Sequence, residues 1–217
     1  MMGRERRQHP KPLKRRVAFR EPRKTLTVFC EGQRTEPEYL EALKRDPEVR
    51  DVAAVDIRVE TRNKGSLPLA LVRMAIDARE RALREEGEVD EFWCVFDVEW
   101  PKNHPGLQEA LTLARENDIK LAVSNPCFEL WLALHFKDHR SFLNNDQARR
   151  LRRSHDGQLD KGLAGSVYMA RKQEAAQRAS ALEKLHARNG MDFPNDNPSS
   201  GMHLLIATVT AQPRTAG

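Results

Sequence analysis

Cysteine is scarce in this chain, and its three cysteines, Cys30, Cys94 and Cys127, lie far apart in apolar segments. No Cys-x-x-Cys pair or Cys/His spacing is present, which excludes the usual structural zinc motifs. Such thiols are typical of reduced core residues in a cytoplasmic protein. No stretch approaches the roughly 18 apolar residues of a membrane span, and no apolar segment of a signal peptide follows the first charges. We therefore expect a cytoplasmic protein with no membrane segment.

Nucleotide-binding motifs and internal repeats are also missing. The chain has no Walker A loop and no Gly-x-Gly-x-x-Gly segment, so no motif supports ATP or NAD binding. Its 217 residues, 39% of them hydrophobic, suffice for one well-buried core with an appendage. We expect three parts: a disordered basic arm at residues 1–23, an α/β domain at 24–136, and a helical C-terminal extension at 137–217 that packs on the core.

Positive charge is concentrated at the start of the chain. Residues 1–24 contain ten Lys or Arg and two acidic residues, whereas the rest of the chain contains 27 basic and 30 acidic residues. Three prolines and few apolar residues keep this arm from forming a core. An arm of this kind, which includes Arg15 and Arg16, can bind nucleic-acid phosphates without sequence preference. A leader that only improves solubility is the alternative.

Strand and helix patterns alternate after the arm. The expected strands are Lys24–Cys30, Val55–Val59, Phe92–Phe96 and Ile119–Val123. Expected helices begin at Thr35 and cover Leu67–Glu86 and Pro105–Asn117. At the first of them, Thr35 and Glu38 have the spacing of a capping box. Strands joined by helices in this way indicate βαβ units, and hence a parallel sheet of about four strands flanked by helices.

The remaining chain is expected to be helical. The segment Cys127–Phe136 is almost wholly apolar, which predicts a helix that is buried on all sides. Residues 146–188 are polar, with a long alanine-rich helix expected from about Ser166. A loop at residues 195–200 is expected to cap a last helix at His203–Val209.

Two acidic residues follow the third expected strand. The run Glu91–Trp100 contains Asp97 and Glu99, which would lie on one face of an extended segment because side chains two positions apart point the same way. Ligands of α/β sheets bind beyond the carboxyl ends of the strands, and Glu31 follows the first strand at that edge. Carboxylate oxygens suit Mg²⁺ or Mn²⁺. We therefore predict a metal site of Glu31, Asp97 and Glu99, with ordinary solvated acids as the alternative.

Two further residues of the apolar segment could belong to this site. Glu129 is its one carboxylate, and an unpaired buried charge is costly. Its partner would be the metal, a basic side chain, or backbone amides at the helix start; a role as complement to the helix dipole explains it equally well. His135 is expected to be a core histidine bonded to a carbonyl rather than a ligand.

Two basic residues flank the expected crevice. Arg34 follows the first strand, and Lys64 lies in the polar turn Asn63–Ser66, where exposed amides could cradle an anion. Both are candidate contacts for nucleic-acid phosphates.

Several motifs resemble those of a known family. The segments Cys30–Tyr39, Trp93–Asp97 and Ser124–Phe136, together with Asn197–Ser199 and the basic leader, are similar to the RloB-like proteins. A Glu after the first strand and an acidic pair after the third also look like a Toprim domain. The Toprim pair is Asp-x-Asp, whereas this chain has Asp-x-Glu.

The resemblance implies a Toprim-like (Rossmann-like) fold and a function in phage defence. RloB-like genes lie near restriction–modification systems, and the family is linked to abortive phage resistance (abortive infection). It implies a nuclease that hydrolyses DNA or RNA with Mg²⁺ or Mn²⁺, and the catalytic candidates are Glu31, Asp97, Glu99 and Glu129. A defence-system partner protein is compatible with this role. The alternative is a catalytically silent nucleic-acid-binding or sensing subunit; primase-like nucleotidyl transfer ranks lower because no zinc or helicase-interaction module accompanies the domain.

Overall fold

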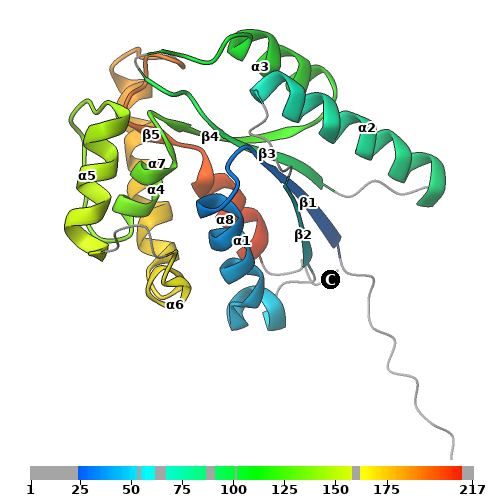
Figure 1. The fold of residues 1–217 in the computed structure, drawn as a ribbon, viewed down its shortest axis with the longest axis horizontal. Helices are drawn as coiled ribbons and strands as arrows, with labels where there is room; N and C mark the ends of the chain where they lie inside the picture. Colours follow the sequence, from blue (N-terminus) through cyan, green and yellow to red (C-terminus); the bar gives the residue numbers. More distant parts are fainter. Residues whose placement is uncertain are drawn as a thin grey trace, which may run out of the picture.

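One sheet organises the molecule, whose computed structural model describes residues 24–52, 55–61, 67–86, 91–100, 102–157 and 162–211. Within these residues, five strands pair in the order β2-β1-β3-β4-β5 (Figure 1). The first four are parallel and β5 is antiparallel to β4. The strands are β1 (Lys24–Cys30), β2 (Val55–Thr61), β3 (Glu91–Asp97), β4 (Lys120–Asn125) and β5 (Ser199–Ser200). The predicted α/β class, with a mostly parallel sheet flanked by helices and a helical C-terminal part, is confirmed.

Two helices cover one face of the sheet. They are α2 (Pro68–Glu86) and α3 (Leu107–Glu116), and the even-numbered residues of β3 pack against them in one apolar cluster. Because side chains alternate along a strand, the odd-numbered residues of β3 face the opposite layer. The same alternation turns Asp97, the last residue of β3, toward that opposite layer.

The opposite layer contains the remaining helices and the larger apolar cluster. Its elements are α1 (Thr35–Arg45), the π-helical turn η1 (Glu48–Val52), α4 (Phe128–Leu134), α5 (Asn145–Asp156), α6 (Gly165–Met169), α7 (Lys172–Arg188) and α8 (Met202–Thr210). Every residue of α4 except Glu129 is buried, as the apolar segment predicted. The aromatic ring of Tyr39 in α1 packs edge-on against Phe128 and Trp131, which ties α1 to α4. Both helices therefore begin close to the carboxyl end of β3.

Three local expectations are wrong. The helix α1 does begin at Thr35, but no side chain caps it, because Glu38 accepts the Leu163 N–H (2.7 Å) instead of closing a capping box. The alanine-rich helix begins at Lys172 rather than near Ser166, after the separate short helix α6. The expected loop at residues 195–200 ends in the strand β5, which pairs with β4. None of the helices in the described residues is long and apolar enough to cross a membrane.

Candidate metal centre

The carboxyl ends of β1 and β3 bring Glu31 and Asp97 together, as their positions predicted. The two strands are adjacent and parallel, with Cys30 opposite Val95 in the register. The backbone N–H of Glu31 continues the ladder by donating to the Val95 carbonyl (3.0 Å). In return, the Asp97 N–H donates to Glu31 Oε2 (3.1 Å). The Glu31 carboxylate is thus fixed beside the end of β3.

Glu36, in the first turn of α1, is a third carboxylate at this edge. It is buried, and its carboxylate accepts hydrogen bonds from the backbone N–H groups of Gly32 and of Glu36 itself. The contact with Gly32 is so close that a Cβ at that position would overlap the carboxylate. A side chain at position 32 would therefore displace the Glu36 carboxylate, so glycine allows that carboxylate to stay against the segment after β1.

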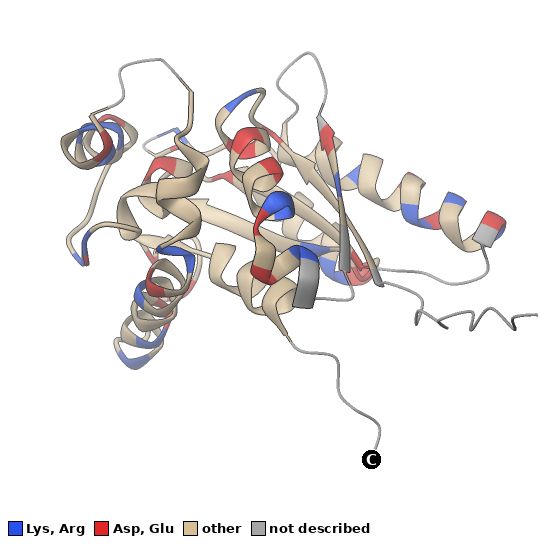
Figure 2. Cartoon of the chain, turned by 90° about the horizontal axis from the view of Figure 1, so that it is seen from below, with Lys and Arg blue, Asp and Glu red and all other residues tan. Residues whose placement is uncertain are grey.

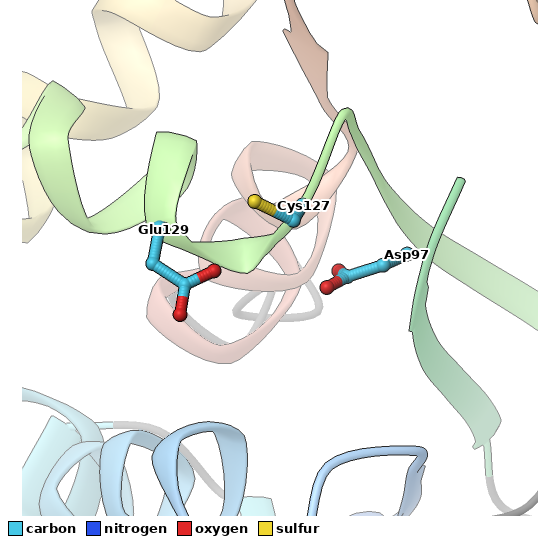
Figure 3. A group of neighbouring side chains, drawn as sticks. All are labelled: Asp97, Cys127 and Glu129. Carbon is cyan, nitrogen blue, oxygen red and sulfur yellow. The ribbon is translucent and has the colours of Figure 1, made fainter. Parts of the chain in front are cut away.

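The start of α4 supplies the fourth carboxylate. Figure 3 shows Asp97 and Glu129 directing their carboxylates into the space between β3 and α4, with Cys127 above them. Each of these three side chains offers one ligand atom, and the three atoms lie within 4.8 Å of one another. The N–H of Phe128, the first residue of α4, donates to the Asp97 carboxylate, and the Cys127 thiol donates a hydrogen bond to the Glu129 carboxylate. We call Glu31, Glu36, Asp97 and Glu129 the acidic cluster.

Burial and mutual repulsion raise the pKa of three members of the acidic cluster, Glu31, Glu36 and Asp97. Burial raises the pKa of Glu31 to about 7, with a further rise from Glu99. Burial likewise raises the pKa of Glu36 to about 7, and Glu129 and Glu31 add to it. For Asp97, burial is again the largest cause of a raised pKa, and the other three carboxylates raise it further. A cation placed among these groups would remove the repulsion that raises each pKa.

One buried oxygen in the acidic cluster has no hydrogen-bond partner among the described residues. This oxygen is Asp97 Oδ1, which has almost no solvent-accessible surface. A buried polar atom without a partner is costly. The orphaned oxygen and the three neighbouring carboxylates together make a donor set that a hard divalent cation would complete.

The thiol of Cys127 fits this cation poorly. Burial raises its pKa above the ordinary thiol range, and Glu129 and Asp97 raise it further, so the sulfur keeps its proton. Only a thiolate is a good metal ligand, whereas the oxygens of Asp97 and Glu129 suit Mg²⁺ or Mn²⁺. The sequence placed Cys127 in the core, and the structure buries it there, directly beside the acidic cluster.

Glu99 takes a different position from the one its spacing predicted. The strand β3 ends at Asp97, and Glu99 has a φ of 61°, in the left-handed region. Its N–H donates to the Pro126 carbonyl (2.9 Å), and its side chain is 46% exposed. The expectation that Asp97 and Glu99 share one face of an extended segment is therefore wrong. Glu99 lies on the outer side of Glu31, and its role as a ligand stays a prediction.

Sequence reasoning missed His104, in the loop between β3 and α3. Its Nε2 lies 2.7 Å from Glu31 Oε1 and 3.8 Å from Glu99 Oε2, and only 11% of its side chain is exposed. The other oxygen of Glu31 accepts the Asp97 N–H, and the close contact of His104 Nε2 with Oε1 lacks the geometry of a hydrogen bond. No sequence motif marks this histidine. The loop folds back so that the His104 N–H donates to the Val98 carbonyl (3.3 Å), and this fold brings the ring to the site.

His135 is a core histidine, as predicted. It is fully buried, its Nδ1 is bonded to the Trp131 carbonyl (3.0 Å), and its Nε2 lies 3.2 Å from the Tyr39 hydroxyl. Burial lowers the pKa of the ring to about 4, so it is neutral at physiological pH. It takes no part in the acidic cluster.

The predicted nucleic-acid contacts are only partly within the described residues. Arg34 is exposed at the start of α1 and pairs with Glu38 (3.1 Å), near the acidic cluster but directed along the helix. Arg15, Arg16 and Lys64 lie outside the described residues. Elsewhere, the Lys and Arg residues of the helices are interspersed with Asp and Glu (Figure 2).

Comparison with known proteins gives a family but no individual relative. The family model described as RloB-like protein matches residues 26–209, a span that covers most of the chain and contains the whole acidic cluster and His104. No curated protein and no solved structure matches the chain.

Proposed function

The chain belongs to the RloB-like family, and we propose that it is a Mg²⁺- or Mn²⁺-dependent nuclease that acts in defence against phage. The observation that carries the proposal is the acidic cluster, in which three carboxylates interact with Asp97, whose Oδ1 is orphaned. Perturbed carboxylates gathered at the carboxyl edge of an α/β sheet are a frequent mark of an active site. The defence role comes from the resemblance of the motifs to those of RloB-like proteins.

The donor set indicates which residues would hold the ion. Asp97 and Glu129 face each other across the space between β3 and α4, and Glu36 is close enough to raise the pKa of Asp97. When bound there, a divalent ion would polarise the scissile phosphate and lower the pKa of a water molecule. The protein's own contribution is orientation: the Phe128 N–H fixes the Asp97 carboxylate, and the Gly32 N–H fixes that of Glu36.

Glu31 and His104 supply a site for proton transfer beside these ligands. The pKa of Glu31, about 7, lies near the working pH, where a general acid or base is most effective. His104 contacts the oxygen of Glu31 that faces away from the Asp97 N–H. The imidazole therefore lies close enough to Glu31 Oε1 to exchange a proton with it after a small reorientation of the ring.

One observation favours a second candidate, a silent nucleic-acid-binding or sensing subunit. The Asp-x-Glu sequence does not build a side-by-side pair of ligands, because Glu99 turns out of the strand direction. A protein that had lost its catalytic ligands would still bind nucleic acid. Metal-dependent cleavage separates the two candidates.

The first experiment is a cleavage screen with the purified full chain. Single- and double-stranded DNA and RNA, end-labelled, are incubated with Mg²⁺, with Mn²⁺ or with EDTA. We expect at least one class to be cut in the presence of a divalent ion and none in EDTA. Binding of nucleic acid without cleavage under every metal condition would reject the nuclease and support the silent subunit.

Replacing His104 should reduce turnover without unfolding the protein. His104→Ala removes the imidazole that lies 2.7 Å from Glu31 Oε1, and loss of such an outer neighbour typically costs about 10- to 100-fold. His104→Gln places an amide N–H within reach of Glu31 and should recover part of the activity. We expect kcat to fall while KM and the melting temperature change little, as measured by steady-state cleavage and thermal unfolding. Equal kcat values for wild type and His104→Ala would remove His104 from the site.

Removing the basic arm should weaken nucleic-acid binding and reduce its dependence on salt. Residues 1–22 contain eight Lys or Arg residues, and each phosphate neutralised contributes about 0.7–0.9 to the slope of log K against log salt. We expect a shallower slope for the chain lacking residues 1–22, measured by fluorescence anisotropy at several salt concentrations. An unchanged slope would show that the arm does not contact phosphates.

A further inference from the structure

An exposed aromatic pair lies next to the candidate metal centre. The Trp100 and Phe142 rings pack edge-to-face, with centroids 5.5 Å apart and planes at 86°. Phe142 is 53% exposed, and Trp100 is partly buried. Trp100 is three residues beyond Asp97, so their Cα atoms lie at most about 11 Å apart. Trp100 is therefore close in the chain to the candidate metal centre, and Phe142 packs on it.

The loop that carries Phe142 is anchored to the sheet. Leu143, the next residue, is buried, and its N–H and carbonyl both bond to the side-chain amide of Asn197 (3.0 and 2.8 Å). The same amide donates to Asn125 Oδ1 (3.2 Å) at the end of β4. The exposed ring is thus held in a fixed place above the carboxyl edge of the sheet, although its own burial contributes little to stability.

The loop that carries Trp100 is anchored to the same edge. The Val98 N–H donates to the Ser124 carbonyl and the Glu99 N–H to the Pro126 carbonyl, both at 2.9 Å. These bonds connect the end of β3 to the turn between β4 and α4. Both loops are therefore hydrogen-bonded to the carboxyl edge of the sheet, where Asp97 also lies.

The surroundings of the pair fit a nucleic-acid strand. Lys102, Lys137 and Arg140 are exposed on the same two loops, together with the acids Glu99 and Asp138. Asp138 is paired with Arg140 (2.9 Å). Exposed rings with nearby cations are the combination that binds single strands, because bases stack on the rings while cations contact the backbone. A base pair inside a duplex has both faces covered, so only an unpaired or end base can stack in this way.

We infer that Trp100 and Phe142 form a stacking platform for an unpaired base adjacent to the scissile phosphate. The inference rests on the proposed function and names its substrate class: a nucleic-acid strand with an unpaired base at the cleavage site. Stacking on an aromatic side chain tolerates any base, because every base has a π-face. The platform positions the strand and does not select its sequence.

Binding in EDTA tests the platform separately from the nuclease, because no metal-dependent cleavage can occur there. The probes are short oligothymidylate, oligouridylate, and an abasic tetrahydrofuran oligomer of the same length. We expect the two base-bearing probes to quench the fluorescence of the wild type. Trp93 and Trp131 are buried (3% and 0% exposed), so the quenching reports on Trp100 and should disappear in Trp100→Phe.

Three variants identify the contact. Phe142→Ala should weaken the binding of the base-bearing probes about 5- to 100-fold and leave the binding of the abasic probe unchanged. Phe142→Leu keeps the apolar area but loses the ring, so it should behave like Phe142→Ala. Leu204→Ala, at another exposed apolar residue (46% exposed) on α8, is the matched control and should change nothing.

Several outcomes would overturn the platform. The platform is wrong if base-bearing and abasic probes bind with equal affinity, or if Phe142→Leu keeps full affinity for the base-bearing probes. It is also wrong if light scattering shows a dimer that Phe142→Ala dissociates, because the patch would then bind a second copy of the chain. Base-dependent binding without cleavage in any metal would keep the platform and reject the nuclease. Metal-dependent cleavage with base-independent binding would reject the platform and keep the nuclease.

Discussion

Asp97→Asn is expected to abolish metal-dependent cleavage, with a loss of at least about 100-fold. The substitution removes the carboxylate at the centre of the acidic cluster, where Glu31, Glu36 and Glu129 all interact with it. A catalytic metal contributes several kcal/mol to transition-state stabilisation, and each 1.36 kcal/mol is tenfold in rate. Calorimetric titration should show that Mn²⁺ binding is lost together with activity.

The same substitution should leave the metal-free protein folded and at least as stable. Burial and three neighbouring carboxylates raise the pKa of Asp97, so an ionised Asp97 is unfavourable in the folded state at pH 8. The neutral amide of asparagine avoids this repulsion, and its NH₂ group can donate to the neighbouring carboxylates. Thermal unfolding in EDTA at pH 8 should give an equal or higher melting temperature than wild type.

An equivalent change at an exposed acid serves as the control. Asp118 has 81% of its side chain exposed and a φ of 56°, a backbone region that asparagine tolerates well. Asp118→Asn should therefore keep both metal binding and cleavage. Normal cleavage in Asp97→Asn would contradict the proposed centre, and an unfolded Asp97→Asn would assign Asp97 a structural role.

The sequence was sufficient to predict the part of the site that depends on strand ends. Parallel strands end at a common edge, and β1 and β3 were both recognisable as apolar runs followed by an acid. The approach of Glu31 to Asp97 follows from that rule alone. The buried helix α4 was equally predictable, because a segment with one polar residue in seven has no face to expose to water.

The members of the site that depend on tertiary contacts could not be predicted in this way. Glu36 reads as an ordinary acid in the first turn of a helix, and only the packing of α1 on α4, through Tyr39, buries it. The spacing of Glu99 predicts an extended i+2 partner of Asp97. Instead, its N–H donates to the Pro126 carbonyl and its backbone adopts a left-handed φ. His104 reaches Glu31 because a loop folds back, and a loop conformation has no period in the sequence.

The acidic cluster should also make the stability of the metal-free protein depend on pH in a defined direction. The pKa of Glu36 is raised from an ordinary 4.5 to about 7. Below pH 4.5 the group is protonated in both the folded and the unfolded chain, and its ionisation costs no stability. Between pH 4.5 and 7 the unfolded chain ionises first, so the free energy of unfolding falls as the pH rises. Above pH 7 the loss is constant, on the order of 3 kcal/mol at most for this group.

His135 acts in the opposite direction over part of this range. Its pKa is lowered from 6.5 to about 4, so stability is lost as the pH falls from 6.5 toward 4, where the unfolded chain takes up a proton first. The wild-type curve is therefore the sum of opposing trends and does not identify Glu36 by itself. A variant that changes Glu36 and keeps His135 separates the two.

Glu36→Gln is that variant, and its stability should rise relative to wild type between pH 4.5 and 7. Glutamine cannot ionise, so the variant lacks the loss caused by Glu36, whereas the contribution of His135 is the same in both proteins and cancels in the difference. The measurement is urea unfolding in EDTA at several pH values from 4.5 to 8. Parallel curves for the two proteins would show that the Glu36 carboxyl is not perturbed and would remove it from the acidic cluster.

Mn²⁺ should reverse the effect in wild type and much less in Glu36→Gln. A ligand that binds only the folded chain stabilises it by about 2.7 kcal/mol at 100 times its Kd, and at pH 8 its charge offsets the repulsion among the ionised carboxylates. Glu36→Gln removes one of the oxygens that would hold the ion, so a weaker gain is expected. Equal stabilisation of both proteins by Mn²⁺ would place the ion away from Glu36 and leave Asp97 and Glu129 to hold it.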